Sequence, residues 1–356
     1  MIVCVLGPYL PGNRLFCLLS FVAHSSSCSF VLVLQHDAQM DYYAKRLATC
    51  SSDSSIKIFE VTADAQRHLS DLLGHEGPVW QVAWAHPKFG SVLASCGYDR
   101  KVVVWREQEG AKNQWSKVYV FGGHELSVNS IAFAPHEYGF VLACGSSDGQ
   151  ISLLTGNSDG SWSAETFLAH KLGVNAVSWA PFSSAGSLLS NAAQNATGVD
   201  SSSPRLVSGG CDSKVKVWII RPTPSSSSSS SASSTSSSNP QSQNASVATM
   251  EHTLEDHVDW VRDVQWAPNI GLPTNTIASA SQDGKVIIWT QEVTDAGKSS
   301  WQKHTLEPFN ETVWRVSWSL TGNILAVTSG DSKVTLWKEA LDHQWKCISS
   351  PEDPSK

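Results

Sequence analysis

The segment Gly74–Trp105 reads GHEGPVWQVAWAHPKFGSVLASCGYDRKVVVW and contains the pattern that decides the fold. A turn with Gly and His precedes the alternating run VWQVAW, a second apolar run leads to Asp99, and the β-branched run KVVVW closes the segment. Short alternating or β-branched runs between turn residues predict β-strands. A fourth run follows around Trp115, so this part of the chain predicts four short strands in succession.

The same unit is repeated along the chain. An Asp is followed six residues later by a bulky apolar residue at Asp53/Phe59, Asp99/Trp105, Asp148/Leu154, Asp212/Trp218, Asp283/Trp289 and Asp331/Trp337. Four short strands repeated roughly every 45 residues are typical of the blades of a WD-repeat propeller. The sequence therefore predicts an all-β fold, a WD40-repeat β-propeller of six four-stranded blades, at about 36–73, 74–122, 123–169, 170–255, 256–308 and 309–349.

Polar residues recur with the repeat and predict a hydrogen-bonded tetrad in three blades. An Asp in the tight turn would accept from a His of the preceding loop, the His would bond a Ser hydroxyl, and the Ser would reach a Trp indole N–H. The tetrads are His75, Ser95, Asp99 and Trp105; His170, Ser208, Asp212 and Trp218; and His257, Ser279, Asp283 and Trp289. The other blades lack one or more members, as in the third, which has Cys144 and Leu154 at the Ser and Trp positions.

A Ser, a His and an Asp in one cluster also suggest a catalytic triad. A triad occurs once in an enzyme, whereas this set recurs in several blades beside a Trp, which favours a structural role. The string at 145–149 fits G-x-S-x-G, but a nucleophile elbow needs a helix after its turn and a strand-like QISLL follows here. No metal spacing or phosphate-cradling loop is found. We therefore predict that the protein is not an enzyme and uses no cofactor or metal.

Composition favours one folded domain and argues against nucleic-acid binding. Only 16% of the 356 residues are charged and 15 are Trp, so there is ample apolar surface to bury. The net charge of −7, without a Lys/Arg cluster, gives no electrostatic attraction to phosphate backbones. The eight cysteines form no Cys-x-x-Cys pair, and four precede a repeat Asp in predicted buried strands, which suggests a reducing compartment.

Three segments fall outside the repeat. Residues 221–247 include a serine tract and predict a flexible loop in blade four, with a regulatory phosphorylation site as the alternative. Residues 350–356 form a tail. Residues 1–35 are atypical and are interpreted as disordered or as a gene-model artefact, while the apolar run LFCLLSFVA at 15–23 leaves a signal peptide open. Within them, SFVLVL at 29–34 could act as a substitute closing strand.

Several strings are more specific than a generic WD repeat. They are HDAQMDYYAKRLATCSSDSSIKIFEV from residue 36, the segment quoted first, DHVDWVRDVQWAPNIGLPTNTIASASQDGKVIIWT from residue 256 and NILAVTSGDSKVTLWKE from residue 323. They resemble the Sec-thirteen family, the small propellers of the COPII vesicle coat that are also found in the outer ring of the nuclear pore. The resemblance runs from about 36 to 349, and the first thirty-odd residues and the serine tract depart from it.

This resemblance implies a structural scaffold subunit of the COPII outer cage, acting in transport from the endoplasmic reticulum to the Golgi, and of the nuclear pore outer ring. The implied partners are a Sec-thirty-one-like coat rod protein that inserts a blade, a nucleoporin of the Y-shaped complex, and the SEA/GATOR complex. The protein would be found on the cytoplasmic face of the endoplasmic reticulum and on COPII vesicles, at the nuclear pore and in the cytosol. It would reach the membrane through the coat without being inserted.

Counting strands supports an open ring that a partner's blade completes. HDAQMDYY serves as the inner strand of blade one, and 344–348 supplies the outer strand of blade six, so no obvious strand is left to close the ring. Exposed sheet edges aggregate unless a partner covers them, and strand addition is a common recognition mode. Candidate contact residues are Asp41, Tyr42 and Tyr43 on blade one and Val313, Trp314 and Arg315 on blade six. For Trp314, packing between blades is the alternative.

A different class of function also stays open, an adaptor that reads peptides on the top face of the propeller. The second residue of each inner strand varies there as Trp80, Asn129, Asn175, Arg262 and Trp314. A reader of phosphopeptides would need several Arg at such positions. A single Arg argues against that reading.

Overall fold

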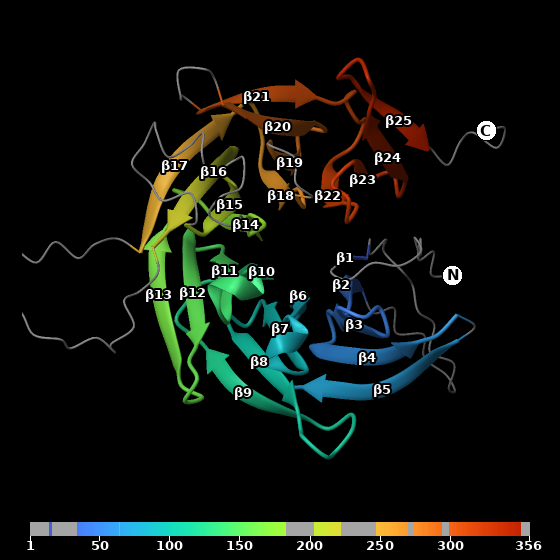
Figure 1. Ribbon diagram of the computed structural model, residues 1–356. Coiled ribbons are helices and arrows are strands. Elements are labelled where there is room, and N and C mark those ends of the chain that lie inside the picture. Colours follow the sequence, from blue (N-terminus) through green and yellow to red (C-terminus); the bar gives the residue numbers. More distant parts are fainter. Residues whose placement is uncertain are drawn as a thin grey trace, which may run out of the picture.

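The computed structural model describes residues 14–15, 34–63, 65–182, 203–221, 247–269, 274–293 and 299–349. In these residues the strands form six antiparallel sheets, which stand around a common centre as the blades of a propeller (Figure 1). Each sheet contains four strands that follow one another in chain order from the centre outward, and one sheet has a further short strand. The predicted all-β propeller of six four-stranded blades is thus confirmed.

The strands of the first three blades have these bounds. Blade 1 contains β2 (Gln35–Met40), β3 (Arg46–Ser51), β4 (Ser55–Val61) and β5 (Gln66–Leu73). Blade 2 contains β6 (Val79–Trp84), β7 (Val92–Gly97), β8 (Val102–Glu107) and β9 (Trp115–Phe121). Blade 3 contains β10 (Val128–Phe133), β11 (Val141–Ser146), β12 (Gln150–Gly156) and β13 (Trp162–Leu168). Two short 3₁₀ turns, Pro87–Phe89 and His136–Tyr138, follow the inner strands of blades 2 and 3.

The remaining blades repeat the arrangement. Blade 4 contains β14 (Val174–Trp179), β15 (Arg205–Gly210), β16 (Lys214–Ile220) and β17 (Ala248–Glu255). Blade 5 contains β18 (Val261–Trp266), β19 (Asn275–Ser281), β20 (Val286–Val293) and β21 (Ser299–Thr305). Blade 6 contains β22 (Val313–Trp318), β23 (Ile324–Ser329), β24 (Val334–Glu339) and β25 (Trp345–Ser349). The expected loop at 221–247 and the tail at 350–356 fall almost wholly outside the described residues.

The repeat Asp is explained by the turn between the second and third strands of each blade. Its carboxylate accepts the backbone N–H two residues later at 2.9–3.3 Å in all six blades. The residue between them has a positive φ of 61–83°, a region that few residues other than Gly adopt readily. The carboxylate therefore replaces backbone hydrogen bonds in a strained turn, which explains why the Asp is the one residue common to the six repeats.

The core lies between the blades rather than inside each one. Blades 1 and 2 share a cluster in which Ile56 and Ile58 pack with Val103 and Trp105, all at most 3% exposed. Equivalent clusters join blades 2 and 3, 3 and 4, 4 and 5, and 5 and 6. Full burial of a large apolar side chain contributes about 1.5–3 kcal/mol. Each blade is thus stabilised mainly by its neighbours in the ring.

One strand was not anticipated from the sequence. The two-residue strand β1 (Arg14–Leu15) pairs antiparallel with β2, with Arg14 opposite Gln39 and Leu15 opposite Ala38. The inner edge of β2 has backbone groups that no strand of its own blade can use, and an extended segment is able to pair with them. The segment SFVLVL lies outside the described residues except for Leu34, which precedes β2 and is not in a strand. No described helix has the length and apolar character needed to cross a membrane.

Candidate partner-binding junction

The junction between blades 6 and 1 is not packed like the other five. The cluster at this position contains buried residues of blade 1 only, Ala38, Met40 and Leu47, with Phe59 partly buried beside them. Phe59 occupies the position that fully packed Trp105 has in blade 2. A gap separates β22–β25 from β2–β5 at the right of the ring (Figure 1). Blade 1 therefore presents an apolar face that no neighbouring blade covers.

The opposite wall of the gap shows the same feature. Val334 and Leu336 on β24 are only partly buried, whereas Val102 and Val104 at the equivalent positions of β8 are completely buried. The hydroxyl Oγ1 of Thr328, on the neighbouring strand, is buried without a hydrogen-bond partner. In blade 2 the corresponding face packs against blade 3. The face of blade 6 thus has the residues of an interblade surface but no blade against it.

Hydrogen bonds between the inner strands also differ at this junction. In the ring, the side chain of the third residue of an inner strand accepts the backbone N–H of the fourth residue in the next inner strand. The bonds are Val82 to Asp37 (3.2 Å), Ile131 to Gln81 (2.7 Å), Val177 to Ser130 (3.2 Å) and Val316 to Asp263 (3.1 Å). Blade 4 has Ala176 at this position, and Ser178 accepts from Trp266 N–H instead, at 3.1 Å. Five junctions therefore have a side-chain acceptor for a backbone donor.

The sixth junction has the opposite polarity. Arg315 occupies the third position of β22, and a guanidinium can only donate. Its Nη1 donates to Asp37 Oδ1 at 3.0 Å and its Nη2 to the carbonyl of His36 at 3.2 Å. Asp37 is fully buried and already accepts Val82 N–H through Oδ2. Among the described residues, the ion pair of Arg315 with Asp37 thus spans a junction whose counterparts elsewhere have an apolar core and a side-chain to backbone hydrogen bond.

A second set of interblade bonds is found at three of the five packed junctions and is also missing at the junction of blades 6 and 1. The indoles of Trp84, Trp179 and Trp318, each the last residue of an inner strand, donate to a carbonyl of the preceding blade at 2.9–3.1 Å. The equivalent residue of blade 1 is Met40, which has no donor. Blade 1 therefore cannot make this bond to blade 6.

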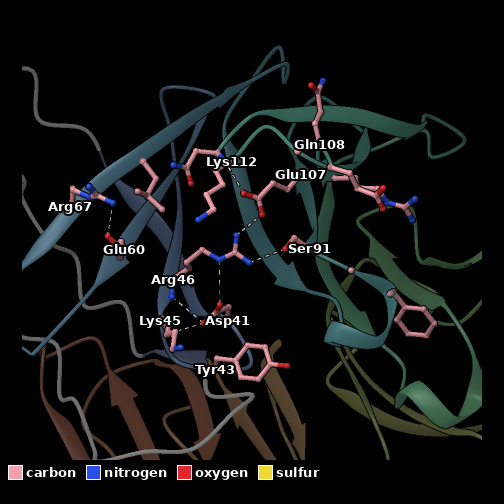
Figure 2. A pocket seen from close by; sticks show the side chains of 17 residues that line it. Asp41, Tyr43, Lys45, Arg46, Glu60, Arg67, Ser91, Glu107, Gln108 and Lys112 are labelled. Carbon is pink, nitrogen blue, oxygen red and sulfur yellow. Dashed lines mark hydrogen bonds and ion pairs between the residues drawn. The ribbon is translucent and has the colours of Figure 1, made fainter.

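The predicted contact residues on blade 1 have two different environments. Asp41 is buried in the wall of a cleft between blades 1 and 2, where it accepts from the backbone N–H groups of Lys45 (2.8 Å) and Arg46 (3.0 Å). Figure 2 shows Arg46 between Asp41 on one side and Glu107 and Ser91 of blade 2 on the other. These contacts fasten blade 1 to blade 2. Tyr42 and Tyr43 follow β2 and are 40% and 64% exposed, so they are accessible to a partner.

The predicted residues on blade 6 also differ from one another. Val313 is fully buried between blades 5 and 6. Trp314 is 49% exposed and stacks on the guanidinium of Arg262, whose carbon lies 4.9 Å from its ring centre. Interblade packing, the alternative for Trp314, thus accounts for part of its surface. Of the six residues, Arg315 is the one that spans the junction, while sequence reasoning missed Asp37, Phe59 and Leu336.

The tetrads form continuous hydrogen-bonded chains inside three blades. In blade 2, Asp99 lies 2.9 Å from His75 Nδ1, His75 Nε2 lies 2.8 Å from Ser95 Oγ, and Trp105 Nε1 donates to Ser95 Oγ at 2.9 Å. The tetrads of blades 4 and 5 have the same links. Because the indole and the backbone surround each Ser, a substrate has no access to it. The arrangement supports the blades and is unsuited to nucleophilic catalysis.

Burial and hydrogen bonds act in opposite directions on the tetrad carboxylates. Burial tends to raise the pKa of Asp283, but hydrogen bonds from His257 and from Val258 N–H lower this pKa to about 2. The pKa of His170 is lowered because burial outweighs the pull of Asp212. In blade 3 Cys144 replaces the Ser, and His124 Nε2 is buried without a hydrogen-bond partner. The described cysteines form no disulfide, and no described group of His, Cys, Asp and Glu is arranged to hold a metal.

Comparison with known proteins agrees with this architecture. The family model "WD domain, G-beta repeat" matches residues 66–106, 115–154, 161–218, 248–290 and 300–338. The chain is 43% identical over 355 residues to the protein transport protein SEC13 of Mycosarcoma maydis, and this alignment covers 88% of the chain and 91% of the relative. The chain belongs to the SEC13 family. The SEC13 homolog of Drosophila melanogaster is 48% identical, with 87% of this chain and 79% of the relative aligned. SEC13 of Coccidioides immitis is 49% identical, with 89% of this chain and 95% of the relative aligned.

On the top face of this SEC13-family chain, the second-position residues of the inner strands make contacts within the ring. At the second position of the inner strands, Trp80 donates to Ser127 at 2.8 Å, Asn129 to the carbonyl of Val174 at 2.9 Å and Asn175 to the carbonyl of Val261 at 2.8 Å. Arg262 lies between Trp260 and Trp314, 5.0 and 4.9 Å from the two ring centres. These residues link neighbouring blades, so the polar groups at this position are already used within the ring.

Proposed function

We propose that this protein is a structural scaffold subunit of a vesicle coat, in which a partner protein inserts a blade between blades 6 and 1. The observation that carries the proposal is the uncovered junction, where two apolar blade faces oppose each other without a shared core. Membership of the SEC13 family supports a role in protein transport, because the relatives are named protein transport proteins. The coat we propose is the COPII outer cage, which acts between the endoplasmic reticulum and the Golgi.

Insertion of a blade has a clear energetic basis. The gap leaves Phe59 partly exposed on one wall and Val334 and Leu336 partly exposed on the other. Covering these three apolar side chains would contribute on the order of 3 kcal/mol, at about 25 cal/mol per Å². The rest of the ring is already packed, so little ordering opposes binding. The free chain is therefore prepared to accept one more sheet.

The mechanical consequence follows from the ring itself. A propeller whose blades are joined by shared cores resists bending, and a partner that contributes a blade becomes part of that rigid body. We propose that a Sec-thirty-one-like rod protein is stiffened in this way at the edge of the coat. The same junction would serve a nucleoporin of the Y-shaped complex and the SEA/GATOR complex. The protein would act on the cytoplasmic face of the endoplasmic reticulum and on its vesicles, at the nuclear pore and in the cytosol.

Affinity purification of the tagged full chain from cells, followed by mass spectrometry, tests this function. The expected result is recovery of a coat rod protein or a pore-ring nucleoporin. Leu336→Asp places a charge on the uncovered face and should abolish that recovery. Leu341→Asp, at a fully exposed position of the turn before β25, is the matched control and should leave it unchanged. Recovery of neither partner class by the unchanged chain would sink the scaffold function.

A further inference from the structure

We infer that the innermost strand of the incoming blade carries an acidic side chain that takes over Arg315 from Asp37. This inference rests on the proposed function and adds the chemistry by which the partner is recognised. It depends on the polarity of the sixth junction, which no other junction of the ring shares.

The regular junctions define what a neighbouring blade must offer. Each has a side-chain acceptor on one inner strand and a backbone N–H on the next, as in the bond from Val82 N–H to Asp37. A partner blade that followed blade 6 by this pattern would present a backbone N–H toward the side chain of Arg315. Two donors would then face each other in a partly buried site, which is unfavourable. The partner must therefore place an acceptor there.

The acceptors on blade 1 that Arg315 uses in the free chain, Asp37 and the His36 carbonyl, are lost on insertion. Each inner strand packs beside its immediate neighbours in the ring, β18 with β22 and β2 with β6. A strand placed between β22 and β2 makes them second neighbours, so the 3.0 Å bond from Arg315 to Asp37 cannot persist. A guanidinium that loses a carboxylate in a partly buried site is best satisfied by another carboxylate, which can accept two parallel hydrogen bonds. An Asp or Glu of the partner meets this requirement.

The other wall of the gap needs a group of the opposite kind. Asp37 is fully buried and keeps the hydrogen bond from Val82 N–H through Oδ2, while its Oδ1 loses Arg315. A buried carboxylate requires a replacement donor on that side. The incoming strand is therefore expected to present an acid toward blade 6 and a hydrogen-bond donor toward blade 1. This polarity fixes the direction in which the blade is inserted and rejects strands without the acid.

The test uses the full chain and the blade-donating protein recovered with it, with affinity measured by biolayer interferometry. Arg315→Gln is expected to weaken binding about 10- to 100-fold, since a hydrogen bond to a charged group is lost. Arg315→Glu should weaken it further, and exchange of the partner's acid for Arg should restore binding to this variant alone. Arg106→Glu, at an exposed position of β8, is the matched control and should bind normally. Arg315→Gln retains a donor for Asp37, so it is expected to fold even if the Glu variant does not.

The outcomes separate this inference from the proposed function. Binding of both Arg315 variants at the affinity of the unchanged chain, together with loss of binding by Leu336→Asp, would refute the acidic contact and leave blade insertion standing. Failure of the unchanged chain to capture any blade-donating protein would refute both. Loss of binding by the Arg315 variants, with rescue by the charge-swapped partner, would establish the contact.

Discussion

Replacement of Ser95 by Ala is expected to lower the free energy of unfolding by more than the loss of one hydrogen bond would. Ser95 Oγ is the centre of the tetrad of blade 2, 2.8 Å from His75 Nε2 and 2.9 Å from Trp105 Nε1. All three side chains are buried, so water cannot replace the hydroxyl. The variant leaves two buried polar groups without a partner, at about 1–3 kcal/mol each. The expected loss is about 2–6 kcal/mol, a large part of the 5–15 kcal/mol typical of folded domains.

Equilibrium unfolding in urea, followed by tryptophan fluorescence, measures this loss as a shift of the midpoint at constant slope. Ser152→Ala is the matched control, because Ser152 is also buried in a strand but has a single hydroxyl partner, Thr166 Oγ1 at 2.8 Å. It should lose about 0.5–1.5 kcal/mol. A loss for Ser95→Ala no greater than that of the control would show that the tetrad does not stabilise the blade and would refute this reasoning.

Three further expectations concern individual ionisable groups. Burial raises the pKa of the Cys96 thiol far above its usual range. At pH 8, iodoacetamide should therefore label the exposed Cys347 within minutes and should label Cys96 only when the protein unfolds. Early labelling of Cys96 would contradict its buried position. The pKa of Asp283 in the folded chain, about 2, lies below its ordinary value of 3.8, so its contribution to stability is complete above pH 4 and is lost as the pH falls toward 2. In the Asp283→Asn variant, the urea midpoint should therefore depend less on pH between pH 4 and pH 2 than in the unchanged protein. An equal pH dependence in the two proteins would contradict this expectation. Burial lowers the pKa of His170, so an NMR titration should give a value under 6.5, and protonation above 6.5 would be inconsistent with this environment.

The blades were predictable from the sequence because their determinants are local. The turn Asp, the residue of positive φ after it and the β-branched run lie within seven residues of one another, as in Asp99, Arg100 and the part of β8 from Val102 to Trp105. The tetrad partners also keep a constant order within each blade. Such short-range patterns do not depend on loop length. This explains why the repeat pattern of blade 4 could be recognised despite its long insertions.

The junction was predictable only in part, because it depends on residues that are far apart in the chain. Arg315 and Asp37 are 278 residues apart in the sequence, and neither residue is unusual within its own strand. A signal was nevertheless present, since the third position is polar in five of the six inner strands, and only blade 6 has a cation there. Asp41 was predicted as a contact residue on blade 1, but its role in holding Arg46 depends on three-dimensional geometry that spacing does not show.

The most direct test of an open ring completed by a partner is a structure of the full chain in complex with the protein recovered by affinity purification. The account predicts strands of the partner between β22–β25 and β2–β5, with Phe59 and Leu336 covered and Arg315 separated from Asp37. A complex in which blades 6 and 1 pack directly on each other, with the partner bound elsewhere on the ring, would contradict it.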